Sequence, residues 1–213
     1  MKGIITKIEE QKRSKNRVNV YIDEEFSFAC SLELIYKYKL IKGQEVDGKE
    51  LEKVAEEDNF LKAKAYAFRV LEKSYKTEKE IEDKLIQRGY EKKVVSRIMD
   101  LLKEYDFMND ERYIKAYIKD NIKKQGKKKL YYNLKNKGIN EELLKEELDK
   151  IPQKTIEKSA YDAGEKKYLQ LIKKEQDNYK LYNKLTGYLM SKGYDYEICK
   201  SVAKGLMDFS EEY

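Results

Sequence analysis

The pattern of apolar positions predicts strands only near the start of the chain. Side chains that alternate between apolar and polar indicate half-buried strands. This alternation is found in the run Ile4 to Ile8, at Val18, Val20 and Ile22, and at Phe26, Phe28 and Cys30. The polar stretches 11–16 and 23–25 between these segments are typical of turns. We therefore expect a small antiparallel meander, with Cys30 as an inward apolar residue, followed by a short helix over 31–38.

Beyond residue 60 the spacing of apolar residues favours helices. The whole chain holds one proline, Pro152, and ten glycines, so little interrupts a helical pattern. Thr77 and Glu80 have the spacing of a capping box, in which each residue satisfies the other's backbone N–H at a helix start. We expect helices over 63–73, from 77, over 92–105, from 109, over 127–137, over 141–150, from 154, and over 178–192, with a last helix ending near 207.

A repeated motif divides this helical part of the chain. The segments 85–91, 134–140 and 189–195 superimpose, and each carries a leucine followed by a basic residue and a glycine. Glycine just after a helix adopts the left-handed backbone that ends it. The basic residue before it, Arg88, Lys137 or Lys192, lies in the last turn, where a cation favours the negative end of the helix dipole. A repeat of this period indicates stacked units.

The expected fold is therefore mainly α. It consists of tandem three-helix, helix-turn-helix-like repeats in an elongated array, preceded by a small N-terminal antiparallel β segment. We divide the chain into an N-terminal β meander plus short helix at 1–60 and three repeats at 61–108, 109–151 and 152–213. Asn140 and Asp195 are suited to cap the helices that follow the second and third glycines, and Glu91 is less suited to cap the first.

Charge is concentrated in the second repeat. The chain carries 46 basic and 40 acidic residues, a net charge of +6, yet ten basic residues and one acid, Asp120, lie between Arg112 and Lys137. On a helix, the basic residues of 111–123 share one face, and Ile114, Tyr117, Ile118 and Ile122 share the other. A basic stripe suits a phosphate backbone, with the adjacent Tyr131 and Tyr132 available to stack on bases. The candidate contacts with nucleic acid or an anionic partner are Arg112, Lys115, Lys119, Lys123, Lys124, Lys127, Lys128, Lys129 and Lys135. The alternative interpretation is that these lysines are only solvated and the tyrosines are core.

Composition argues against most enzyme classes. The chain has no histidine, which excludes imidazole ligands and the catalytic triads that need one. Cys30 and Cys199 are too isolated for a zinc site or a disulfide framework. No phosphate-binding or nucleophile motif occurs, and the carboxylates Glu141, Glu142, Glu146 and Glu147 are read as surface charge. We expect no catalysis, cofactor or metal. Because 40% of residues are charged and no apolar run approaches the length of a membrane span, we expect a cytoplasmic protein.

Residues from Ala63 to Ile151 resemble the RecX family, the regulators of RecA recombinase. The likeness lies in their order and spacing: Ala67-Phe68-Arg69-Val70-Leu71, Thr77 with Glu80, Lys84-Leu85, Gly89, Phe107-Met108-Asn109-Asp110-Glu111-Arg112-Tyr113, Ala116-Tyr117, Gly126, Leu130, Leu134 and Lys137-Gly138-Ile139. Asp106 stands where the family has a glycine. The third repeat matches more loosely, around Lys192-Gly193-Tyr194, and the N-terminal segment is similar to that of longer family members.

This resemblance implies a regulator without an enzymatic site. Such a protein binds the RecA–DNA filament and damps RecA's ATPase, strand-exchange and coprotease activities in recombination, DNA repair and the SOS response. The expected partners are the RecA filament and single- or double-stranded DNA, bound by a monomer with no membrane contact. The sequence leaves open whether the protein inhibits or activates, and whether it caps filaments or lies in their groove. It also leaves open two other classes: a sequence-nonspecific DNA-binding repeat protein that acts without RecA, and a scaffold for another partner.

Overall fold

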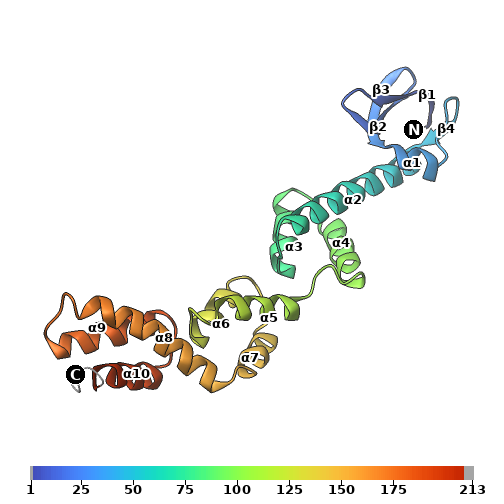
Figure 1. Cartoon of the computed structure of the whole chain (residues 1–213). Helices are drawn as coiled ribbons and strands as arrows, with labels where there is room; N and C mark the ends of the chain where they lie inside the picture. Colours follow the sequence, from blue (N-terminus) through green and yellow to red (C-terminus); the bar gives the residue numbers. More distant parts are fainter. Residues whose placement is uncertain (1, 209–213) are drawn as a thin grey trace. The chain divides into compact units, whose positions relative to one another are not determined.

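The computed structural model describes residues 2–208, which form two compact units (Figure 1). The first unit holds the residues up to Ser74 together with Ile81–Tyr105. The second holds Tyr75–Glu80 together with the residues from Asp106 onward. Most described residues are helical, with a small antiparallel sheet at the N-terminus, which confirms the expected fold class.

The sheet of the first unit has the strand order β3-β2-β1-β4 and is antiparallel throughout. Strands β1 (Lys2–Gln11), β2 (Ser14–Ile22) and β3 (Glu25–Ser31) form the expected meander, and the β1–β2 turn is shorter than the polar stretch suggested. Asp23 and Glu24, at φ 49° and 70°, make a tight hairpin turn that matches the strand twist. Strand β4 (Glu45–Asp47) was not expected, because three residues are too few to show alternation.

The inner face of the sheet builds a small core with helix α1 (Leu32–Lys37). Cys30 is fully buried there, as its place in the alternation predicts. Burial raises the pKa of the Cys30 thiol to about 11, so the thiol stays protonated and is a poor nucleophile. Cys30 is therefore an apolar packing residue.

Helix α2 (Gly48–Lys73) begins well before the expected start at Ala63, so the expected domain boundary at residue 60 falls inside a continuous helix. Its start is fixed by a capping box, in which the Asp47 carboxylate accepts from the Glu50 N–H at 2.9 Å. The Glu50 side chain accepts in return from the Asp47 N–H at 3.0 Å. The part of this helix before Ala63 is rich in charged residues, so the spacing of its few apolar residues did not indicate a helix.

A buried carboxylate on α2 ties this helix to the sheet. Asp58 is 5% exposed, and its carboxylate accepts from both terminal nitrogens of Arg17 at 3.1 and 3.2 Å and from the Ser31 N–H at 2.9 Å. The Lys62 ammonium group also pairs with the Asp58 carboxylate, at 2.7 Å. Burial alone would raise the pKa of Asp58. The hydrogen bonds from Arg17, Lys62 and Ser31 outweigh burial and hold that pKa below its ordinary value.

Asp58→Asn is expected to destabilise the first unit by about 3 kcal/mol at pH 7, because it leaves the Arg17 guanidinium without its counter-charge. Since the folded pKa of Asp58 is depressed, its contribution is present above the unfolded pKa of about 4 and is lost as the pH falls through the folded value. Urea unfolding of wild type and variant should therefore converge in acid. Glu56→Gln, which breaks an exposed pair with Lys93, is the matched control and should cost less than about 1 kcal/mol. An equal loss of unfolding free energy in the two variants would contradict the role of Asp58 as the buried partner of Arg17.

Helices α3 (Glu78–Gln87) and α4 (Lys92–Glu104) complete the first repeat. The predicted capping box at the start of α3 is confirmed: the Thr77 N–H donates to Glu80 at 3.1 Å, and the Glu80 N–H donates to the Thr77 hydroxyl at 3.2 Å. Arg97 of α4 lies 3.6 Å above the centre of the Phe60 ring and pairs with Glu57 at 2.8 Å, which joins α4 to α2.

The second unit contains both remaining repeats. The helices are α5 (Asp110–Asn121), α6 (Lys127–Lys135), α7 (Glu141–Asp149), α8 (Gln153–Leu171), α9 (Asn178–Ser191) and α10 (Tyr196–Asp208). The side chains of Asn109, Asn140 and Asp177 cap α5, α7 and α9. Buried residues of both repeats form one continuous apolar cluster, so neither repeat holds a core of its own.

All three repeat glycines adopt the predicted left-handed backbone. Gly89, Gly138 and Gly193 have φ of +88°, +78° and +88°. Asp106, at the position where the resemblance implies a glycine, also has a positive φ of 55°. Aspartate tolerates this region better than most residues, so the turn before α5 adopts a left-handed residue without a glycine.

Two of these turns dock on the N-terminal end of the middle helix of the preceding repeat. The Gly126 N–H donates to the Lys192 carbonyl at 2.9 Å, and the Lys128 N–H donates to the Gly193 carbonyl at 3.1 Å. The Thr77 hydroxyl likewise donates to the Lys137 carbonyl at 2.7 Å, and a Cβ on Gly138 would overlap the Lys79 side chain. The same contact is thus made twice in the second unit.

Lys137 does more than neutralise a helix end. Its ammonium group donates to Glu80 at 2.8 Å and lies 5.6 Å from the centre of the Tyr113 ring. The hydrogen bond to Glu80 raises the pKa of Lys137. The expectation from the helix dipole alone was therefore incomplete, because Lys137 also connects two repeats.

Lys137→Met is expected to lower the unfolding free energy of the second unit by about 1 kcal/mol, several times the few tenths expected from the dipole alone. Methionine keeps the length and apolar stem of the side chain, so thermal unfolding reports the lost pair. Lys145→Met, at an exposed lysine of α7 with no ion pair among the described residues, is the control and should change little. Equal effects of the two changes would show that the pair with Glu80 contributes nothing.

Candidate nucleic-acid interface

The nine predicted contact residues lie on α5, on α6 and on the connection between them. The apolar face predicted for α5 packs inward: Ile114 is fully buried, and Tyr117, Ile118 and Ile122 pack against the core of the second unit. This confirms the two-faced pattern. The basic face of α5 is solvent-exposed.

Acids neutralise four of the nine cations. One of these acids, Asp195, is distant in sequence, and the other three lie within six residues of the cation they pair with. The ion pairs are Arg112 with Asp106 at 2.8 Å, Lys115 with Glu111, Lys128 with Asp195 at 3.0 Å, and Lys135 with Glu141 at 2.7 Å. Asp195, expected mainly as a helix cap, thus holds a lysine of the preceding repeat. The local charge surplus is smaller than the sequence count suggests.

The remaining five cations have no acidic partner among residues 2–208. Lys129 reaches only the Ser191 carbonyl, at 3.5 Å. We call these five residues the lysine cluster: Lys119, Lys123, Lys124, Lys127 and Lys129. The one acid within this stretch of chain is Asp120, on the exposed side of α5. The structure therefore concentrates unpaired positive charge around the α5–α6 connection.

The backbone that carries the cluster is fixed by hydrogen bonds from the third repeat. The Ser159 hydroxyl donates to the Ile122 carbonyl at 2.6 Å, so the Tyr194 hydroxyl must donate to Ser159 across their 2.7 Å contact. Burial raises the pKa of Tyr194, which keeps this donor protonated. At the other end of the connection, Gly126 is held by the Lys192 carbonyl. The third repeat thus positions the lysines of the second, a role that nothing local in the sequence around Ser159 or Tyr194 indicates.

One of the two adjacent tyrosines faces solvent, as expected for neighbouring residues on a helix. Tyr132 is 62% exposed, whereas the Tyr131 hydroxyl donates to Glu141 at 2.8 Å, and this bond raises the pKa of Tyr131. The two rings meet edge to face, with centroids 5.6 Å apart. Only Tyr132 offers a face on which a base could stack.

One of the four carboxylates assigned to the surface is buried. Glu147 is 4% exposed and accepts a hydrogen bond from Lys150, with Lys115 4.0 Å away. The interpretation of Glu147 as surface charge was therefore wrong. Glu147 lies one turn before the capping residue Lys150 on α7 and pairs with it. No group of acids and cysteines in residues 2–208 has an arrangement that could hold a metal ion.

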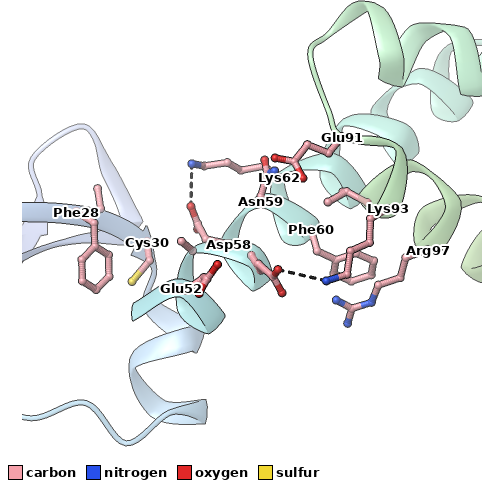
Figure 2. A pocket seen from close by; sticks show the side chains of 14 residues that line it. Phe28, Cys30, Glu52, Asp58, Asn59, Phe60, Lys62, Glu91, Lys93 and Arg97 are labelled. Carbon is pink, nitrogen blue, oxygen red and sulfur yellow. Dashed lines mark hydrogen bonds and ion pairs between the residues drawn. The ribbon is translucent and has the colours of Figure 1, made fainter. Parts of the chain in front are cut away.

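A hollow of about 540 Å³ lies in the first unit between β3, α2 and α4 (Figure 2). Its three cations all face acids: Lys62 pairs with Asp58, Lys93 with Glu56, and Arg97 with Glu57. Its further acids, Glu52 and Glu91, would repel phosphate. This hollow is therefore unsuited to nucleic acid.

Comparison with known proteins assigns the family. Sequence models of four domains match the chain: the N-terminal domain of regulatory protein RecX at 3–47, and the first, second and third three-helix domains of RecX at 63–102, 109–148 and 156–202. The regulatory protein RecX of Clostridium perfringens (strain SM101 / Type A) is 47% identical over 204 residues, which are 96% of each chain. The chain belongs to the RecX family. RecX of Clostridium tetani (strain Massachusetts / E88) is 46% identical over 203 residues, 95% of this chain and 94% of its own.

Solved RecX structures share the fold. A crystal structure of regulatory protein RecX superimposes with a TM-score of 0.73 at 24% identity, covering 97% of this chain and 99% of its own. The structure of RecX from Lactobacillus salivarius gives a TM-score of 0.63 at 25% identity, over 70% of this chain and 97% of its own. These structures confirm the sheet-plus-repeats architecture, and the sequence models and relatives confirm the resemblance to RecX predicted from sequence. A helix long and apolar enough to cross a bilayer does not occur in residues 2–208.

Proposed function

We propose that this RecX family member regulates RecA by binding the RecA–DNA filament and damping its ATPase, strand-exchange and coprotease activities. Membership of a family named for regulation supports the proposal, and the lysine cluster is the observation on this chain that carries it. Such a protein would act as a monomer in the cytoplasm, in recombination, repair and the SOS response. Its effect would come from binding, and the proposal requires no catalysis.

The lysine cluster is the proposed contact with DNA. An ammonium group without a protein partner gains a counter-charge when it meets phosphate, whereas a paired lysine must first give up its carboxylate. Lys119, Lys123, Lys124, Lys127 and Lys129 are therefore the main contacts. Arg112, Lys115, Lys128 and Lys135, which are paired, contribute mainly to the long-range field. Tyr132 stacks on a base beside them.

Titration of RecA's DNA-dependent ATPase tests the proposal. A regulator that engages the filament lowers the ATPase rate at concentrations well below those needed to coat the DNA. Excess single-stranded DNA would then restore the rate only in part. An ATPase rate that stays unchanged at every ratio of the protein to RecA would show that the protein does not regulate RecA.

A sequence-nonspecific DNA-binding protein that acts without RecA is the second candidate, and the unpaired lysines favour it as well. Such a protein competes for DNA, so it would slow RecA only near full coating of the strand. Added DNA would then restore the ATPase rate completely. The same titration therefore distinguishes the two functions.

A further inference from the structure

The turn of the first repeat has the same backbone form as a turn that docks on a helix. At Gly89 and Gly193 φ is +88°. The Gly89 N–H donates to the Ile86 carbonyl at 2.9 Å, just as the Gly193 N–H donates to Met190 at 2.9 Å. In both turns the next N–H reaches back to the repeat's leucine, at 3.2 and 3.3 Å. The backbone carbonyl groups of the two turns are therefore arranged alike.

In its own unit the Gly89 turn is uncovered. Nothing in the first unit lies within 4 Å of the position a Cβ on Gly89 would take, whereas a Cβ on Gly138 or Gly193 would overlap its neighbour. The carbonyl groups of Arg88 and Gly89 accept no hydrogen bond within the first unit, in contrast to those of Lys192 and Gly193, which accept from backbone N–H groups. The turn thus presents unused acceptors.

The surroundings of the turn suit a protein more than a nucleic acid. Ile86, beside the turn, is 46% exposed, and Gln87 is exposed next to it. The Arg88 guanidinium lies 5.1 Å from the centre of the Tyr66 ring, so it is drawn toward its own unit. Free carbonyl groups at the end of α3 carry partial negative charge, which attracts N–H donors and repels phosphate.

The middle helices of a second copy of this chain offer no free receiving end. The N-terminal ends of α3 and α6 already hold the turns of the second and third repeats. Gly126 lies eight residues before the repeat leucine Leu134, and the corresponding residue before Leu189 is Leu181. Leu181 lies inside α9, and its N–H already donates to Asp177 at 2.9 Å. The receiving helix is therefore not a middle helix of a second copy, and the inference takes it from another protein.

We propose that the Gly89 turn is a protein-docking surface that receives the first turn of a helix from a partner protein. The two internal copies of this contact define what fits: backbone N–H groups, or a cap hydroxyl such as that of Thr77, placed against the carbonyl groups of the turn. This inference rests on the proposed function, because the partner protein used to test it is RecA. It separates the molecule into a DNA-contacting lysine cluster and a protein-contacting turn.

Gly89→Asn tests the inference directly. Asparagine tolerates a positive φ, and the space around Gly89 is open, so the free protein should fold and bind single-stranded DNA as wild type does. The added side chain would collide with a docked helix. We expect affinity for RecA filaments on DNA to fall about tenfold, as for a residue at the centre of an interface. We also expect p-benzoylphenylalanine at Gln87 to photo-cross-link to RecA, and the same group at the exposed Gln170 of α8 not to do so.

The inference requires both results. Wild-type filament binding by Gly89→Asn, or no cross-link from Gln87 to RecA, overturns it and leaves the proposed function standing. Equal loss of binding to bare DNA would make the turn a DNA contact, and a cross-link between two copies of this chain would make it a self-association surface; either result also overturns the inference. If wild type itself fails to bind RecA filaments, the proposed function falls, and the inference falls with it.

Discussion

Replacing Lys123, Lys124 and Lys127 by glutamine is expected to weaken binding to single-stranded DNA about a hundredfold at 0.1 M salt. Each lysine that neutralises a phosphate contributes about 0.7 to the slope of log affinity against log salt, so losing three lowers the slope by about 2. The loss should be the same for every DNA sequence, since phosphates carry no sequence information. Fluorescence anisotropy across a salt series measures both quantities.

The matched control removes three positive charges elsewhere in the same unit. Lys166, Lys173 and Lys174 are exposed and have no ion pair among the described residues. Their triple replacement by glutamine changes the net charge equally. An equal loss of DNA affinity in the two triple variants would show that overall charge, rather than the lysine cluster, controls binding. Lys128 is excluded from the test set because its pair with Asp195 joins two repeats.

Gly193→Ala is expected to destabilise the second unit by about 4 kcal/mol. The positive φ alone costs an alanine about 1–2 kcal/mol. The rest arises because the new Cβ overlaps the backbone of Lys129, which cannot move without shifting α6. Because the same contact positions Gly126 and the lysine cluster, DNA affinity should fall along with stability. Thermal unfolding followed by circular dichroism gives the first result and anisotropy the second.

Gly187 provides the control for this substitution. It lies inside α9 with open space around it, so Gly187→Ala should leave stability unchanged or raise it by up to about 1 kcal/mol. If Gly193→Ala were as stable as Gly187→Ala, the docking of the third repeat's turn on α6 would not contribute to the fold.

Local features of the fold could be predicted from sequence because they depend on a few adjacent residues. The left-handed turn at Gly138 and the capping box of Thr77 with Glu80 are set by residue type and spacing alone. The start of α2 was missed because charged residues conceal its apolar face, although Asp47 and Glu50 have the spacing of a capping box. Strand β4 depends on pairing with a distant strand and has no local signal.

The basic stretch could be found from sequence, but the sequence could not show which of its lysines lack an acidic partner. Asp195 neutralises Lys128, and Glu141 neutralises Lys135. Asp195 is distant in sequence, and only the fold brings it next to α6. A helical neighbour such as Glu111, four residues before Lys115, is the one partner that spacing could have indicated. Selecting the lysine cluster from the nine candidates therefore required the tertiary structure.

Binding to RecA filaments assembled on single-stranded DNA, compared with binding to the same DNA without RecA, tests the central claim most directly. We expect tighter binding to the filament, because the protein then uses contacts with RecA in addition to the phosphates that the lysine cluster meets. Replacing Lys123, Lys124 and Lys127 should weaken binding to both targets while preserving the preference for the filament. Equal or weaker binding to the filament would contradict regulation through the RecA filament and leave a protein that binds DNA alone.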